Sequence, residues 1–198
     1  MNTPAHLILA AAIWARPTRR GAHPGRQARV NGAALAGALV PDASLYFMVL
    51  WEARVNGRTP RQIFGEDYRD PFWQTVFAVD NSIPLWVALT ALSAWRRWPL
   101  LGALSGAALL HVLTDFPLHH NDGRAHFMPF TDWIYESPVS YWDPNHYGWL
   151  VGPLEGLLCL GLGAILWRRF SSRVSHALIA VALLAELAPA ILFPLLFG

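Results

Sequence analysis

The residues best suited to chemistry stand close together near the middle of the chain, at His111, Asp115 and His119. His111 and Asp115 are four positions apart, so on a helix their side chains lie on one face, about one turn from each other. Pro117 would end or bend that helix, because proline lacks an amide donor and restricts the residue before it. His119 could then fold back toward the same point. Two imidazoles and one carboxylate that converge in this way predict a site for a divalent metal ion, with zinc as the first choice.

Three further side chains are candidate ligands for the same metal. Asp42 follows Pro41, which would kink its helix and could aim the carboxylate at the cluster. His6 stands near the start of a short apolar segment and reaches the depth of His111 if that segment enters from the outer face. His126 lies in the polar loop behind the cluster. The alternative is that each intramembrane His or Asp serves only as a hydrogen-bond partner between helices.

The composition indicates a membrane protein of a single domain, residues 1–198. Apolar residues make up 54% of the chain and charged residues only 14%, and several apolar runs approach the length of a bilayer span. The net charge of +2 comes from short arginine blocks between apolar segments and gives no reason to expect a nucleic-acid partner. Cys159 is the single cysteine, which excludes a disulfide framework and a cysteine metal cluster. The apolar start lacks the basic region of a signal peptide, so we expect it to be retained.

The order of apolar and polar segments predicts an all-α polytopic membrane helical bundle. A short helix over residues 4–15 would insert partway or pack against the other helices, since it is too short to cross a bilayer alone. Five full spans follow, with the second interrupted near its start by Asp80-Asn81-Ser82 and Pro84. They cover residues 30–51, 75–95, 98–118, 147–167 and 175–197. Two long polar loops, 52–74 and 119–146, would lie outside the membrane.

Arginine is distributed unevenly between the connecting segments. Segments 16–29, 96–97 and 168–173 hold 10 Arg and no acid, whereas segments 52–74 and 119–146 hold 5 Arg and 8 acids. If five spans alternate in direction, the two sets fall on opposite faces of the membrane. Because basic loops stay in the cytoplasm, we expect a protein of the bacterial inner membrane with loops 52–74 and 119–146 on the periplasmic side.

Five acids fall within the predicted spans, where an unpaired carboxylate costs several kcal/mol. Asp42, Asp80, Asp115 and Glu155 all lie within roughly 5–13 Å of the same, outer end of their spans. Carboxylates gathered at one depth in this way are what a buried polar site would require. Asp80 and Glu155 could instead pair with Arg or hydroxyl groups, and Glu186, near the middle of its span, favours a protonated or hydrogen-bonded structural role.

This pattern resembles the family of predicted bacterial inner-membrane metal-dependent hydrolases. The motifs that carry the resemblance are Thr3-Pro4-Ala5-His6, Pro41-Asp42, and His111-Val-Leu-Thr-Asp115 followed by Pro117 and His119. The last motif is also similar to the metal-binding helix of zinc-dependent phospholipases C and related nucleases, which hydrolyse phosphoesters. The family usually carries a His-Ser pair at the start of the following span, where this chain reads Val79-Asp80-Asn81-Ser82. Either Asp80 replaces that ligand or one metal position is lost.

The function expected on these grounds is hydrolysis of an ester or phosphoester of a lipid or lipid-linked substrate at the outer face of the membrane. Asp80 or Asp122 would serve as general base. Arg124 would hold the phosphate, or would simply pair with Asp122. Two other classes stay open, namely a metal- or proton-coupled transporter and a non-catalytic structural subunit of the membrane.

Overall fold

The computed structural model describes the backbone of residues 1–18 and 24–197, with side chains described for 1–18 and 25–188. All regular secondary structure in these ranges is helical, which confirms the predicted all-α class. The elements are α1 (Thr3–Trp14), α2 (Pro24–Arg54), α3 (Pro60–Gly65), η1 (Asp67–Arg69), α4 (Pro71–Asp80), α5 (Ile83–Arg96), α6 (Pro99–Asp115), η2 (Phe116–Leu118), η3 (Pro144–His146), α7 (Gly148–Arg169) and α8 (Arg173–Phe197).

Four helical segments within the described residues are long and apolar enough to cross a membrane: Gly25–Arg54, Pro71–Arg96, Pro99–Leu118 and Gly148–Arg169. They correspond to the first four predicted spans. The predicted fifth span falls on α8, which is not one of these four candidates, so the count of five is not confirmed.

The second candidate span is two helices, α4 and α5, separated at Asn81 and Ser82. Ser82 caps α5 by accepting a hydrogen bond from the Leu85 amide at 3.1 Å, and Pro84 lies in the first turn, where a proline is tolerated. The backbone amide and the side chain of Asn81 both donate to the carbonyl of Phe77, at 2.9 and 3.0 Å, and so close the last turn of α4. The break therefore falls where the sequence predicts it, whereas α2 continues through Pro41.

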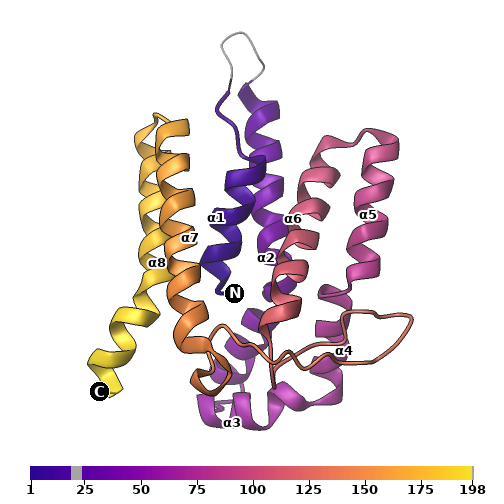
Figure 1. The fold of residues 1–198 in the computed structure, drawn as a ribbon. Coiled ribbons are helices and arrows are strands. Elements are labelled where there is room, and N and C mark those ends of the chain that lie inside the picture. The colour runs from indigo at the N-terminus through magenta and orange to yellow at the C-terminus, as the bar shows by residue number, and fades with distance from the viewer. Residues whose placement is uncertain (19–23, 198) are drawn as a thin grey trace.

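Helix α1 lies at the centre of the bundle and contacts α2, α6, α7 and α8 (Figure 1). It begins inside the bundle and runs toward the end where α5 joins α6 and α7 joins α8. Ala5 and Ala10 are buried against its neighbours, and small side chains of this kind let helices approach closely. As a result, His6 in the first turns of α1 is buried in the interior, 2% exposed.

The two ends of the bundle differ in the segments that they carry. The start of α2, the α5–α6 connection and the α7–α8 connection lie at one end, which we call the arginine-rich end after Arg26, Arg29, Arg96, Arg97, Arg168 and Arg169. Helix α3 and segment 119–146 lie at the other end, which we call the loop end (Figure 1). Backbone hydrogen bonds hold segment 119–146 over the bundle, among them Ile83 amide to His126 carbonyl at 2.9 Å and Tyr141 amide to Leu118 carbonyl at 3.1 Å.

Helices α2 and α6 pack most closely at Gly37. A methyl group at this position would overlap the backbone carbonyl of Leu104, so only glycine allows the observed approach. One consequence is that the Nδ1 atom of His111 on α6 reaches the carbonyl of Ala38 on α2 at 2.7 Å. This contact fixes the orientation of the His111 ring.

Candidate metal centre

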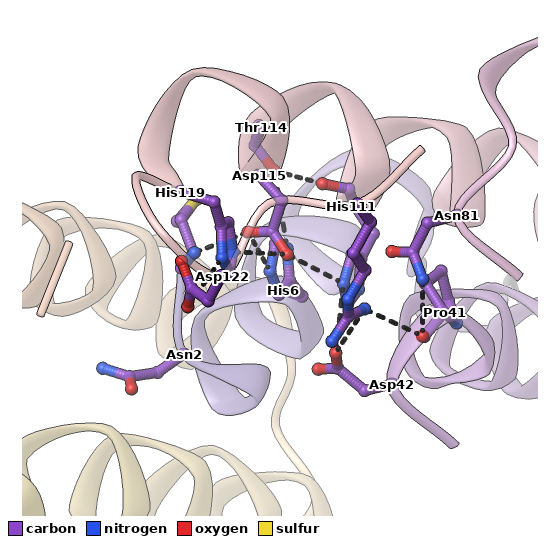
Figure 2. Close-up of polar contacts among 12 residues, drawn as sticks. Asn2, His6, Pro41, Asp42, Asn81, His111, Thr114, Asp115, His119 and Asp122 are labelled. Atoms are coloured by element: carbon purple, nitrogen blue, oxygen red, sulfur yellow. Dashed lines mark hydrogen bonds and ion pairs between the residues drawn. The ribbon is translucent and has the colours of Figure 1, made fainter. Parts of the chain in front are cut away.

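His6, His111 and Asp115 come together from α1 and α6 in the buried interior near the loop end. One ligand atom from each lies within 4.8 Å of the other two. The Nε2 atom of His6 is 3.0 Å from Asp115 Oδ1, and the Nε2 atom of His111 is 3.2 Å from Asp115 Oδ2. Figure 2 shows both rings directed at the Asp115 carboxylate, and the two rings stack with centroids 3.5 Å apart. These three residues form the trio on which the site is built.

The hydrogen bonds of His111 define which of its nitrogens carries a proton. Its Nδ1 atom lies 2.7 Å from the Ala38 carbonyl, which can only accept, so we assign the proton to Nδ1. In the neutral ring, Nε2 then presents a lone pair toward Asp115 Oδ2. That Nε2 atom is buried and has no hydrogen-bond partner in the described part of the chain. His111 is therefore in the tautomer that binds metals through Nε2.

His6 makes two polar contacts in the interior. Its Nε2 atom is hydrogen-bonded to Asp115 Oδ1 at 3.0 Å. Its Nδ1 atom lies 3.4 Å from the Thr114 hydroxyl, which is 2.9 Å from the carbonyls of both Leu110 and His111. With its proton on Nε2, His6 donates to Asp115; with its proton on Nδ1, it turns the Nε2 lone pair toward Asp115. Only the tautomer of His111 is defined by its hydrogen-bond partners.

The unpartnered Nε2 lone pair of His111 faces a carboxylate that can only accept, and a divalent ion among the three groups would satisfy them all. In a tetrahedral zinc site with bonds of about 2.0–2.1 Å, neighbouring ligand atoms are about 3.3 Å apart. The 3.0 Å separation of His6 from Asp115 Oδ1 and the 3.2 Å separation of His111 from Asp115 Oδ2 are close to that spacing. The Met1 ammonium also lies 2.5 Å from Asp115 Oδ1, but it leaves His111 Nε2 without a partner. The residues of the trio therefore fit a divalent metal ion.

Asp42 and His119 lie at the edge of the trio (Figure 2). Asp42 Oδ1 is 3.7 Å from His111 Nε2, while its Oδ2 accepts a hydrogen bond from the Thr3 hydroxyl at 2.5 Å. His119 Nε2 is 3.5 Å from Asp115 Oδ2, and its Nδ1 is 3.1 Å from Asp122 Oδ2. Burial alone would lower the pKa of His119, but the neighbouring carboxylates of Asp115 and Asp122 outweigh it and raise that pKa. Both predicted ligands are thus close enough to join a metal after small side-chain movements.

His126 lies beside the trio, where it contacts the break between α4 and α5. Its Nδ1 atom lies 3.0 Å from the Asn81 carbonyl, and the ring is 3% exposed. Burial lowers the pKa of His126 to about 4, so the ring is neutral at physiological pH. It bounds a small gap together with Asp115, His119 and Arg124. His126 is therefore near the trio but is not one of its members.

Arg124 is a buried part of the site wall. Its guanidinium lies 4.9 Å from the centroid of the Phe77 ring, and Nη1 is 3.8 Å from Asp42 Oδ1 and 3.4 Å from the Pro41 carbonyl that accepts its hydrogen bond. The expected pairing with Asp122 is not what the structure has. Its partner is Asp42, the second residue of the Pro-Asp motif.

Of the two candidate general bases, only Asp122 reaches the site. Asp122 Oδ1 is buried and has no hydrogen-bond partner in the described residues, whereas its Oδ2 accepts a hydrogen bond from Trp142 Nε1 at 3.0 Å and lies 3.1 Å from His119 Nδ1. Burial alone would raise the pKa of Asp122, but the neighbouring His119 and Trp142 side chains outweigh it and lower that pKa. Asp80, in contrast, ends α4 outside the trio and the cavity, and its backbone carbonyl accepts a hydrogen bond from Trp86 Nε1 at 2.7 Å. The neighbouring Asn81, 1% exposed, is the residue that turns inward.

A cavity of about 470 Å³ opens above Asp115 at the loop end. This volume lies within the range of small-molecule sites, about 300–1,000 Å³. Charged side chains on its wall come from Asp42, Asp115, His119, Asp122, Arg124 and Arg69. Aromatic side chains come from Tyr46, Phe64, Tyr68, Tyr141 and Trp142. A ligand in this cavity would therefore touch Asp115, the member of the trio on its wall, and both charged and aromatic groups.

Sequence reasoning missed several residues that build this site. Thr3 was part of a motif, but its hydrogen bonds to Asp42 and to the Tyr46 hydroxyl at 2.6 Å follow only from the position of α1. Asn81 could have been found as the polar residue at the helix break. Tyr141, in the far part of the loop, gives no such signal.

The remaining two intramembrane acids lie apart from the trio. The Asn2 amide donates to Glu155 at 2.6 Å, and the Asn2 side chain donates to Glu186 at 3.4 Å. Each of these carboxylates keeps one buried oxygen without a partner among the described residues. Glu155 and Glu186 thus anchor the start of α1 between α7 and α8, in agreement with the hydrogen-bonded role expected for Glu186.

Comparisons with protein-family models, with curated proteins and with solved structures found no match for this chain. The resemblance to membrane metal-dependent hydrolases stays a prediction.

Proposed function

We propose that this protein is a membrane-embedded metal-dependent hydrolase of the kind that its motifs resemble, acting on an ester or phosphoester of a lipid or lipid-linked substrate. The observation that carries the proposal is the convergence of two imidazoles on one buried carboxylate next to an open cavity, with the His111 Nε2 lone pair facing that carboxylate. A histidine with only a structural role would direct a donor at such a carboxylate, as the His111 ring does not. This difference favours a metal site over a non-catalytic structural subunit.

The metal would be zinc or another divalent ion held by His6, His111 and Asp115, with His119, Asp42 and His126 as further candidate ligands. When bound, the ion supplies Lewis acidity, which lowers the pKa of water toward about 7 and polarises an ester oxygen. Asp122 is placed to accept a proton inside the cavity, because its Oδ1 has no other partner among the described residues. Arg124 holds Asp42 in place and turns its remaining charge toward the cavity, where it favours an anionic group.

The substrate class follows from the position of the cavity. Its wall includes Tyr46 of α2, which is 56% exposed, and the exposed apolar side chains of Phe47 and Leu50 continue along the same helix. In a bilayer these side chains would face lipid. An amphipathic molecule could thus enter sideways and bring its polar group to Asp115.

The proposal includes a fifth span formed by α8 and an orientation with the arginine-rich end in the cytoplasm. The sequence supports this orientation, because segments 16–29, 96–97 and 168–173 together hold ten arginines and no acid. The trio, near the loop end, would then act at the periplasmic side of a bacterial inner membrane. Fusion of a reporter enzyme after Arg54 and after Arg97 tests it, because the two sites should report opposite sides.

Metal analysis of the detergent-purified protein tests the site. We expect about one equivalent of a divalent metal in the wild type and its loss in His111→Ala, with His176→Ala as the matched control outside the trio. Turnover of a chromogenic phosphodiester that chelator abolishes and added metal restores would support a hydrolase. Metal-free wild-type protein that takes up no zinc on titration would refute the proposal.

A transporter is the second candidate, because the break between α4 and α5 resembles the discontinuous helices of ion-coupled carriers. Against it, the cavity opens only at the loop end among the described residues. Metal uptake into liposomes that contain the protein, without phosphodiester turnover, would favour the transporter.

A further inference from the structure

An apolar groove of about 410 Å³ lies at the arginine-rich end, between the start of α2 and the start of α6. Val30, Trp98, Pro99, Leu100 and Leu101 form its apolar wall. The same groove is bounded by two arginines of α2, Arg26 and Arg29. It is at the opposite end of the bundle from the trio and plays no part in the proposed hydrolysis.

The two arginines present charge that no acid of the described chain neutralises. Arg26 and Arg29 are three positions apart on α2, so they share one face of the helix, and both are exposed. Neither forms an ion pair with a described carboxylate, and Arg29 donates only to the backbone carbonyl of Gly25 at 3.2 Å. A ligand with a negative group would find two exposed guanidinium groups, neither paired with a described carboxylate, at the mouth of an apolar groove.

A second groove, also about 410 Å³, adjoins the first across Trp98 and Pro99. Its wall includes Trp14, Gly102 and Gly106, and its outer edge carries Arg97. The neighbouring Arg96 guanidinium lies 5.9 Å from the centroid of the Trp98 ring, so its charge is also held near this ridge. Two apolar grooves thus flank one tryptophan, and both have arginine at the edge.

We infer that this region binds an acidic phospholipid, with the phosphate between Arg26 and Arg29 and one acyl chain in each groove beside Trp98. The basic edge above the two apolar grooves is complementary to a phosphate above two hydrocarbon chains. Basic pockets between membrane helices select anionic headgroups through the same combination of charge and burial. A zwitterionic lipid fills the grooves equally well but gains less from the arginines, because its own cation opposes them.

The test compares lipids with identical acyl chains and different headgroups. Full-length protein in a neutral detergent is titrated with phosphatidylglycerol or with phosphatidylcholine, and bound lipid is counted by native mass spectrometry. We expect tighter binding of phosphatidylglycerol by roughly 10- to 30-fold, which is the effect of two arginines near a charged group. The variant R26Q/R29Q should lose this preference and keep its binding of phosphatidylcholine.

The control is R54Q/R61Q, which removes the same charge at the loop end from two exposed arginines. This variant should keep the preference for phosphatidylglycerol. Equal binding of both lipids by the wild type would overturn the inference, and so would a preference that survives in R26Q/R29Q or disappears in the control. Competition by glycerol phosphate at the lipid's own concentration would also overturn it, because it would mean that the site recognises phosphate without the chains. None of these results depends on metal binding or turnover.

Discussion

Replacement of Asp115 by asparagine should abolish the part of the protein's stability that depends on metal. Asparagine has nearly the same shape, but it carries no charge and adds an NH₂ donor. In the metal-free protein, the variant loses the charge that faces the Met1 ammonium at 2.5 Å, and removing one partner of a buried ion pair costs about 3–5 kcal/mol. It gains a donor within reach of the His111 Nε2 lone pair, 3.2 Å from Asp115 in the wild type, and a hydrogen bond contributes about 1 kcal/mol. Without metal, the variant should therefore be less stable than the wild type by roughly 2–4 kcal/mol.

The difference between variant and wild type should widen when metal is added. An ion at 100 times its dissociation constant stabilises the folded state by about 2.7 kcal/mol. For a chain of 198 residues, each kcal/mol raises the melting temperature by about 2–4 °C. Zinc should therefore raise the melting temperature of the wild type by roughly 5–11 °C and leave Asp115→Asn almost unchanged.

Thermal unfolding of detergent-purified protein, followed by tryptophan fluorescence with and without chelator, measures both quantities. Asp80→Asn is the matched control, because it removes a carboxylate from α4 without touching the trio. The control should keep the whole shift. A zinc-dependent rise that persists in Asp115→Asn, or that is absent from the wild type, would refute the reasoning.

Three further predictions concern the elements that hold the site. In chemical denaturation, Gly37→Ala should destabilise the protein by about 3 kcal/mol or more, because the new methyl group overlaps the Leu104 backbone. Its control is Gly32→Ala, which has open space around it and should stabilise the protein by up to about 1 kcal/mol in the same assay. Arg124→Met should lower the free energy of unfolding by about 3 kcal/mol in that assay, because a buried guanidinium is removed and its partner carboxylate stays. A loss below about 1 kcal/mol would show that the Arg124–Asp42 pair does not stabilise the fold. Because burial lowers the pKa of His126 to about 4, the metal-free protein should lose stability as the pH falls from about 6.5 to about 4, by up to about 3 kcal/mol. His126→Gln should flatten that part of the stability profile, and a profile of unchanged slope would contradict the assignment.

Much of the site could be predicted from local sequence. His111 and Asp115 share a face because a helix repeats every 3.6 residues, and this rule needs no knowledge of the neighbouring helices. Hydropathy located four candidate spans, and the Asp80-Asn81-Ser82 run marked the break in the second. These features depend on energies that are determined within one segment of the chain, namely backbone hydrogen bonding and the transfer of apolar side chains out of water.

Which side chains enter the site is decided by packing between helices, which local patterns do not encode. Asp80 and Asn81 are adjacent, yet only Asn81 is turned inward, because rotation of α4 about its axis is set by its contacts with α2. Arg124 lies in a loop near Asp122, yet it pairs with Asp42 from a distant helix. The count of five spans is not confirmed, because the four candidate spans among the described residues do not include α8.

The sequence by itself determined the helical class, the separation of arginine from acid along the chain, and one pair of residues that could hold a cation. Only the tertiary structure brought His6 to that pair, by placing α1 in the centre of the bundle. The close approach of α2 and α6 at Gly37 and the Ala38 carbonyl that takes the Nδ1 proton of His111 were likewise beyond the sequence. The physical reason is that a helix fixes its own periodicity, while its depth and rotation depend on the shapes of all the helices around it.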